Sequence, residues 1–192
     1  MTIVPSADRI LEALYQRSAG GTPVLLAPNH HTRGAMMDHA VFAELCFGFC
    51  QAGHCTLRFN YGGVGASTAG STKRDQSRDE EDLRSAHQHL RETAQQKCML
   101  IAHGYACRLL KDIEQEFSRI ALIDPQSDDL EDFIEGTRAS TYHIFLSSKN
   151  AERQALKESI HDLPHTVIAN TTAGFQRGLP QLREAVVNFL SR

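Results

Sequence analysis

Short apolar runs, several of them rich in β-branched residues, alternate along this chain with longer segments that repeat with the period of a helix. Each short run suits a buried strand, and each longer segment suits a helix whose apolar stripe covers a sheet. The alternation predicts an α/β fold: a doubly wound, mostly parallel sheet of about six strands in a three-layer α/β/α arrangement. The expected strands are Val24–Ala27, Thr56–Phe59, Cys98–Ala102, Ile120–Ile123, Tyr142–Leu146 and Thr166–Ala169.

The segments between the strands carry the helical patterns. Ser77–Ala94 has a capping box formed by Ser77 and Glu80, followed by apolar residues at helical spacing. Further helices are expected at Met36–Cys50, Tyr105–Gln115, Asp128–Glu135, Ala151–Ile160 and Leu182–Leu190.

The N-terminal segment also fits a helix. Ser6 is a suitable cap for Ala7–Arg17, and Ala19 to Gly21 would end the helix. The residues at helical spacing are Ile10, Leu11, Leu14 and Tyr15. We therefore expect residues 1–21 to form a helix and a linker at one end of a single domain that spans residues 1–192.

Composition excludes some partners. The formal net charge of −3 offers no basic face for nucleic acid or for an anionic membrane surface. The first residues contain neither a basic region nor an apolar core of a signal peptide, which predicts a cytoplasmic protein. The five cysteines lack zinc-type spacing, so they are interpreted as small buried apolar residues. We expect no metal and no cofactor.

A glycine-rich segment, Gly62–Lys73, invites a comparison with phosphate-binding loops, because glycines let backbone amides approach a phosphate. The spacing does not match. Ser71 and Thr72 separate Gly70 from Lys73, and Thr68 stands where the dinucleotide pattern has its third glycine. A nucleotide loop and a plain turn-rich loop both stay open, and the spacing favours the plain loop.

Two stretches near the first strands match a known pattern. Pro28–Met36 is similar to a His-Pro-His-x-x-Gly-Gly-Thr-Met loop. Leu57–Ser67 is close to Leu-Arg-Phe-Asn-x-Arg-Gly-Val-Gly-x-Ser. Farther on, Glu81–Leu83 leads a helix into a strand that ends at the turn Ala102–Ala106.

Taken in this order, the motifs resemble small α/β hydrolases of the dienelactone-hydrolase-like kind, from about Pro23 to the C-terminus. The resemblance implies an α/β-hydrolase-like sheet with strand order 2-1-3-4-5-6. Members of that family carry an N-terminal β-hairpin, and this chain departs from them in offering a helical pattern there.

The resemblance also locates the three catalytic positions of such a hydrolase. The nucleophile's place, at a strained turn that requires small residues two before and two after it, is Gly104, between Ala102 and Ala106. The base's place is Ala173, and the acid's place lies near Asn150, with no carboxylate before Glu152. A Ser-His-acid relay needs all three side chains. The triad is therefore predicted to be degenerate, and Gly104 is predicted to have a positive φ.

Polar residues nevertheless follow the carboxyl ends of the strands, where open α/β sheets bind their ligands. The candidate ligand-binding residues are Asn29, His30, His103, Tyr105 and Asp124. Simple solvation of these loops is the competing interpretation. His30, His31 and His103 could together approach a metal, but adjacent histidines usually point apart, so no metal site is predicted.

Two functions remain open. One is a pseudoenzyme, a non-catalytic module that binds an unknown small molecule or protein. The other is a divergent hydrolase of a small ester or carboxylic-acid derivative, in which His103 orients a water and Asp124 acts as base. The sequence carries no signal for a particular oligomeric state.

Overall fold

A computed structural model describes residues 1–29, 36–71, 75–111, 113–136 and 141–191. Its centre is a mixed sheet of eight strands in the order β1-β2-β4-β3-β5-β6-β7-β8. The strands are β1 (Thr2–Ser6), β2 (Arg9–Gln16), β3 (Gly21–Ala27), β4 (His54–Phe59), β5 (Met99–His103), β6 (Ile120–Ile123), β7 (Tyr142–Ser147) and β8 (His165–Ile168).

Strands β3 to β8 form the parallel part of the sheet. They correspond to the six expected strands, and their order confirms the predicted 2-1-3-4-5-6. The expected total of six was wrong, because β1 and β2 extend the sheet beyond β4 in antiparallel fashion. All carboxyl ends of β3 to β8 therefore meet along one edge of the sheet.

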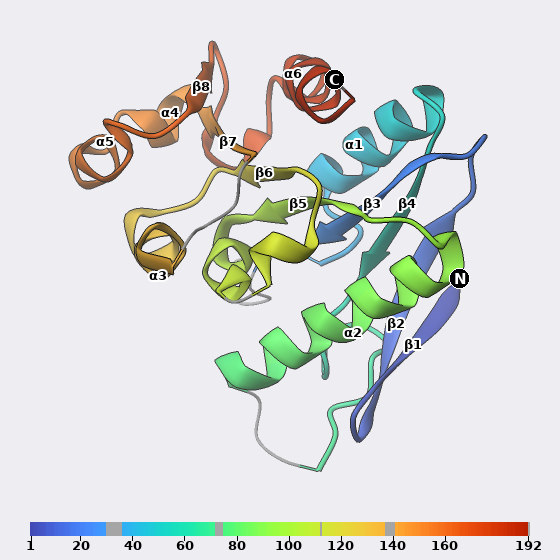
Figure 1. Cartoon of the computed structure of the whole chain (residues 1–192). Coiled ribbons are helices and arrows are strands. Elements are labelled where there is room, and N and C mark those ends of the chain that lie inside the picture. Colours follow the sequence, from blue (N-terminus) through green and yellow to red (C-terminus); the bar gives the residue numbers. More distant parts are fainter. Residues whose placement is uncertain (30–35, 72–74, 112, 137–140, 192) are drawn as a thin grey trace.

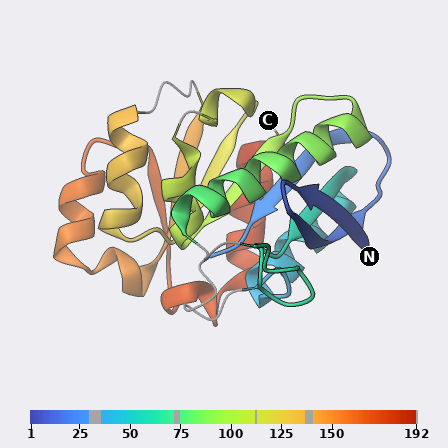
Figure 2. The same cartoon turned by 90° about the horizontal axis from the view of Figure 1, so that it is seen from below.

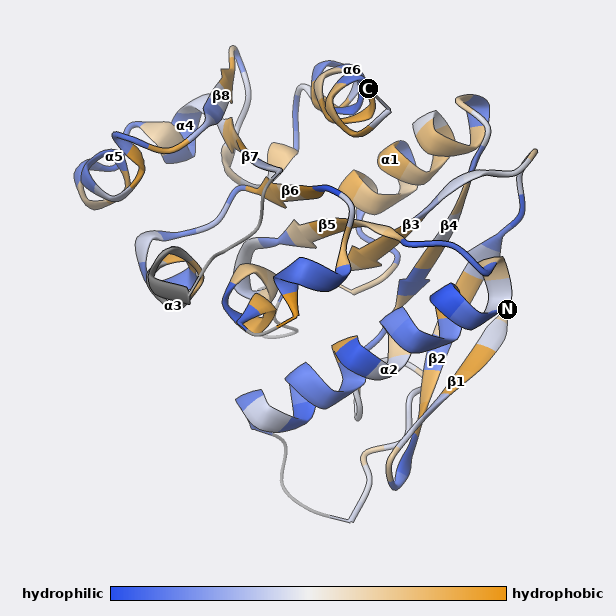
Figure 3. Ribbon diagram, in the orientation of Figure 1, coloured by the Kyte–Doolittle hydropathy of each residue, from blue (hydrophilic) through white to orange (hydrophobic). Residues whose placement is uncertain are grey.

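Helices cover both faces of the sheet (Figures 1 and 2). One face is covered by α1 (Ala40–Gln51) and α6 (Leu179–Leu190), and the other by α2 (Gln76–Ala94) and α3 (Ser127–Gly136). Two short helices, α4 (Ser148–Ala151) and α5 (Gln154–Ile160), connect β7 to β8. Apolar residues concentrate on the central strands, whereas α2 is largely hydrophilic (Figure 3). No helix within the described residues has the length and apolarity to cross a bilayer.

The predicted N-terminal helix was wrong, because residues 2–16 form a β-hairpin. Arg9, Leu11 and Ala13 are buried at every second position, as in a strand with one covered face. Ile10, which a helix would have turned inward, is 47% exposed. Ala7 has φ 46° in the two-residue turn, and Ser6 pairs with Arg9. The expected departure from the resembled hydrolases at the N-terminus was therefore wrong as well.

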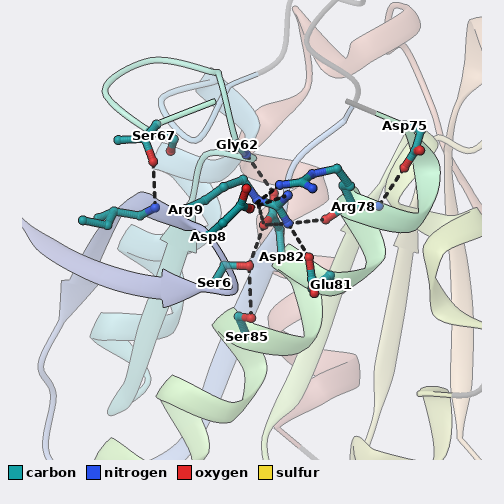
Figure 4. Close-up of polar contacts among 12 residues, drawn as sticks. Ser6, Asp8, Arg9, Gly62, Ser67, Asp75, Arg78, Glu81, Asp82 and Ser85 are labelled. Atoms are coloured by element: carbon teal, nitrogen blue, oxygen red, sulfur yellow. Dashed lines mark hydrogen bonds and ion pairs between the residues drawn. The ribbon is translucent and has the colours of Figure 1, made fainter. Parts of the chain in front are cut away.

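A buried cluster of charges fastens this hairpin to α2 (Figure 4). The Arg9 Nε donates to Asp82 Oδ1 at 3.0 Å, and one Arg9 Nη lies 2.7 Å from Glu81. Asp82 also accepts the Ser6 hydroxyl at 2.7 Å and the Gly62 amide at 2.8 Å. Both the Arg9 and the Asp82 side chains are 1% exposed. Asp82 thus joins the hairpin, α2 and the glycine-rich loop.

The glycine-rich loop itself uses its amides within the protein. Gly62 donates to Asp82, and Ala66 donates to Glu12 Oε2 at 2.8 Å. Gly63 donates to the Thr68 carbonyl at 3.0 Å. The Gly62 and Ala66 amides, which could otherwise bind a phosphate, thus already donate to carboxylates of the protein. This supports the plain-loop interpretation.

Further helix predictions need correction. The helix expected at Met36–Cys50 begins only at Ala40, and the one expected at Ala151–Ile160 is interrupted between α4 and α5. Asp75, rather than Ser77, caps α2, because its carboxylate accepts the Arg78 amide at 3.0 Å. The expected α-helix at Tyr105–Gln115 is a 3₁₀-helix over Gly104–Leu110, followed by a short turn at Glu114–Glu116. The first of these packs against both α2 and α3, and six of its seven residues are buried. Packing on several sides here overrides the local helical preference.

Candidate functional site

The sharp turn after β5 leads directly into the 3₁₀-helix at Gly104. Gly104 has φ 53°, which confirms the predicted left-handed conformation. Ala102 and Ala106 are fully buried on either side, so the strand and the following helix can approach closely. The backbone of a nucleophile elbow is therefore present, with glycine at its centre.

The side chain of Asn29, two residues beyond the end of β3, fills the space above Gly104. A Cβ atom built on Gly104 would lie 2.6 Å from Asn29 Nδ2 and 2.7 Å from Asn29 Cγ, closer than real Cβ contacts come. Asn29 Oδ1 also accepts the Tyr105 amide at 3.0 Å. In α/β hydrolases the amide after the nucleophile helps to bind the oxyanion. Here the Asn29 carboxamide fills the space in which a side chain at position 104 would stand, and it accepts the hydrogen bond of the following amide.

Asp124 lies directly after β6 and has φ 48°. Its carboxylate accepts the Ser147 amide and the Ser147 hydroxyl, each at 2.9 Å, and the Gly174 amide at 2.9 Å. Aspartate tolerates the left-handed region better than most residues. Asp124 thus ties the ends of β6 and β7 to the loop that contains the expected base position.

These elements surround a cavity of about 170 Å³ at the carboxyl edge of the sheet. The described residues that line it are Asn29, His103, Asp124, Gln126, Asn150, Arg153, Ala173 and Gly174. The set includes three of the five candidate ligand-binding residues and two of the three expected catalytic positions. Sequence reasoning missed Gln126 and Arg153, although both follow the ends of strands closely in the chain. The cavity is the candidate functional site.

The other two candidates lie elsewhere. Tyr105 is not part of the lining, because its hydroxyl donates to Asp79 Oδ2 at 3.0 Å, toward the start of α2. His30 and His31 fall outside the described residues. Within the described ranges, no group of three His, Cys, Asp or Glu side chains could hold a metal ion.

His103, the last residue of β5, is the most perturbed group in the lining. Its side chain is buried among the rings of His39 and Phe42, whose centroids lie 5.4 and 5.9 Å away. Burial, with a smaller effect of His39, lowers the pKa of His103 to about 3. The imidazole is therefore neutral at physiological pH. Its Nδ1 has no hydrogen-bond partner in the described part of the chain.

The expected acid and base positions have other roles or none. Asn150 is 3% exposed, and its Nδ2 donates to the Pro125 carbonyl at 2.9 Å. Ala173 begins the short 3₁₀ turn Ala173–Phe175 and carries no polar atom in its side chain.

Two larger hollows, of about 510 and 400 Å³, lie beside the C-terminal half of α2 and share Arg91 and Glu116. Since α2 leads into the start of β5, they lie at the opposite edge of the sheet.

The fold matches several solved structures. An α/β serine hydrolase homologue from Coxiella burnetii matches with a TM-score of 0.83 and 18% identity, over 97% of this chain and 95% of that one. An α/β serine hydrolase without a lid, from Xanthomonas campestris, gives 0.85 and 16%, over 100% and 93%. The chain has the α/β-hydrolase fold.

A third structure of this fold, a putative α/β hydrolase from Agrobacterium tumefaciens, matches with a TM-score of 0.85 and 17% identity, over 100% of this chain and 94% of that one. No protein-family model matches the sequence, and no curated protein matches it. At these identities the likeness concerns the α/β-hydrolase fold alone.

Proposed function

We propose that this α/β-hydrolase-fold protein is not a serine hydrolase and that it uses the cavity at the carboxyl edge of the sheet as a ligand-binding or interaction site. The observation that carries the proposal is the contact between Gly104 and Asn29. Glycine supplies no nucleophile, and the Asn29 side chain occupies the space in which one would stand.

The rest of the cavity is consistent with this function. Serine needs a base within hydrogen-bond reach to become nucleophilic at neutral pH. Ala173 offers no base, and the buried Asn150 amide is bonded to a backbone carbonyl. The Tyr105 amide, which would stabilise an oxyanion, already donates to Asn29 Oδ1. On this proposal the nucleophile and the base are absent, and the oxyanion donor is already hydrogen-bonded to Asn29.

The divergent hydrolase is the second candidate, because His103 and Asp124 line the same cavity. Two observations weigh against it. Since the pKa of His103 is about 3, its imidazole could orient a water but would accept a proton poorly at neutral pH, so Asp124 would have to act as the base alone. The Asp124 oxygens accept hydrogen bonds from Ser147 and Gly174, so abstraction of a proton would compete with those contacts.

Hydrolysis of p-nitrophenyl esters of increasing chain length distinguishes the two functions. We expect the unmodified protein to match the rate of buffer with every ester. The controls are His103→Gln and the matched exposed variant His161→Gln. Turnover that His103→Gln abolishes and His161→Gln preserves would favour the divergent hydrolase and overturn the non-catalytic proposal.

A further inference from the structure

The described lining of the cavity contains one acidic and one basic side chain, Asp124 and Arg153, which form no ion pair with each other. Burial keeps the imidazole of His103, which also lines the cavity, neutral at physiological pH. The remaining lining is formed by side-chain amides, an alanine and a glycine. A lining of one carboxylate and one guanidinium matches a ligand that carries one positive and one negative group.

Among the described residues, Asp124 has no cationic side chain as a partner. Its residue is 9% exposed, and it forms no ion pair with any described residue. Three hydrogen bonds, from the Ser147 amide and hydroxyl and from the Gly174 amide, hold the carboxylate in place but bring no positive charge to it. An ammonium group in the cavity would supply that charge.

Arg153 offers a guanidinium group for the negative group of such a ligand. It is exposed, precedes α5, and makes no side-chain capping bond. No ion pair between Arg153 and a described acidic residue is present, so its guanidinium is available for a carboxylate. The unpartnered Nδ1 of buried His103 adds a neutral hydrogen-bonding atom in the same lining.

Size limits the ligand further. At ~30 Å³ per water molecule, the 170 Å³ of the cavity corresponds to roughly five or six waters. Pockets for drug-sized ligands measure roughly 300–1,000 Å³. The volume of the cavity therefore matches a molecule of amino-acid size.

We propose that this cavity binds a small zwitterion of the amino-acid class, with its ammonium group at Asp124 and its carboxylate at Arg153. The inference rests on the proposed non-catalytic function and gives its binding site a ligand class. It requires no reaction and no cofactor.

The test is a titration followed by ¹H–¹⁵N correlation NMR with three probes: L-alanine, propionate and ethylammonium. The two latter compounds each carry one of the two charges on a similar carbon frame. L-Alanine is expected to shift the backbone amide signals of Gln126, Ser147 and Gly174 in a saturable manner. Propionate and ethylammonium are each expected to bind about tenfold more weakly or worse.

A pair of variants assigns the carboxylate end. Arg153→Gln should weaken binding of L-alanine about tenfold and leave binding of ethylammonium unchanged. Arg177→Gln is the matched control, because Arg177 is also exposed, lies close to Gly174 in the chain, and does not line the cavity. It should leave both affinities unchanged.

Three results would overturn the inference: no saturable shift with L-alanine, equal affinity for propionate and L-alanine, or an unchanged affinity for L-alanine in Arg153→Gln. None of these results would indicate catalysis. Ester hydrolysis, in contrast, would overturn the proposed function whatever the titration gives, so the two failures are distinguishable.

Discussion

At the scale of single residues, the contact between Gly104 and Asn29 gives the sharpest expectation for stability. Gly104→Ser adds a Cβ at positive φ and also places it 2.6 Å from the Asn29 amide. Gly174→Ser adds a Cβ at a similar φ of 68° with no atom within 4 Å. Backbone strain at such positions costs ~1–3 kcal/mol.

We therefore expect Gly104→Ser to lower the free energy of unfolding by more than Gly174→Ser does, with the difference measured by urea denaturation. Asn29→Gly should remove most of that difference when combined with Gly104→Ser, because the clash disappears and the strain remains. Equal losses in the two serine variants would show that Asn29 does not restrict this turn.

The lowered pKa of His103 predicts how the free energy of unfolding depends on pH. Its pKa is lowered from 6.5 to about 3 in the folded protein, chiefly by burial. Between these values the unfolded chain binds a proton that the folded chain does not, so stability falls as the pH falls from about 6.5 toward 3. His103→Gln should flatten this part of the stability profile. His161→Gln, on the exposed surface, should keep the slope of the unmodified protein; a slope unchanged in His103→Gln would contradict the assignment.

At the scale of elements, the N-terminal hairpin supplies a guanidinium group, that of Arg9, which the resembled motif carries in the loop after β4. Gly62 stands where that motif has arginine, and a Cβ on Gly62 would lie 2.6 Å from Arg9 Cδ and 3.3 Å from Asp82 Oδ2. The Arg9 guanidinium therefore occupies the space in which a side chain at position 62 would lie, and it pairs with Asp82 from the hairpin.

This replacement is testable with a double-mutant cycle. Arg9→Ala leaves the Asp82 carboxylate buried without its partner, at a cost of about 3–5 kcal/mol. Gly62→Arg alone should also destabilise the protein, because two guanidinium groups compete for one space. The double variant should be more stable than either single one, as measured by the free energy of unfolding. If the losses in free energy of unfolding of the two single variants simply add in the double variant, an arginine at position 62 does not replace Arg9.

The same elements show why some predictions succeeded. Strands β5 and β6 are buried at every position, so their continuous apolar runs are unambiguous, and the strand order followed from the motifs. The hairpin was missed because Ile10, Leu11, Leu14 and Tyr15 fit the helical period. Its strand conformation depends on the pairing of β2 with β4 and on the Arg9–Asp82 contact, both distant in sequence.

For the site, sequence reasoning could place residues at or just beyond the ends of strands, such as Asn29, His103 and Asp124. It could not foresee that the Asn29 carboxamide turns toward Gly104 and accepts the Tyr105 amide, since that depends on a side-chain conformation. Arg153 was missed because the sequence placed it inside the expected helix Ala151–Ile160, whereas in the structure it precedes α5 and lines the cavity.

At the scale of the whole molecule, the α/β-hydrolase fold combines parallel strands, a sharp turn centred on Gly104 and a cavity at the carboxyl edge of the sheet. Such a scaffold is consistent with binding in place of catalysis, because the cavity is shaped by strand ends and not by the triad. The central claim is therefore that no serine of this protein is activated.

The most direct test of that claim is reaction with a fluorophosphonate probe, followed by intact mass spectrometry. Such probes modify only an activated serine. We predict that the unmodified protein keeps its mass under conditions in which a control serine hydrolase is fully modified. One covalent adduct per chain, lost when a serine at the carboxyl edge such as Ser147 is changed to alanine, would contradict the account.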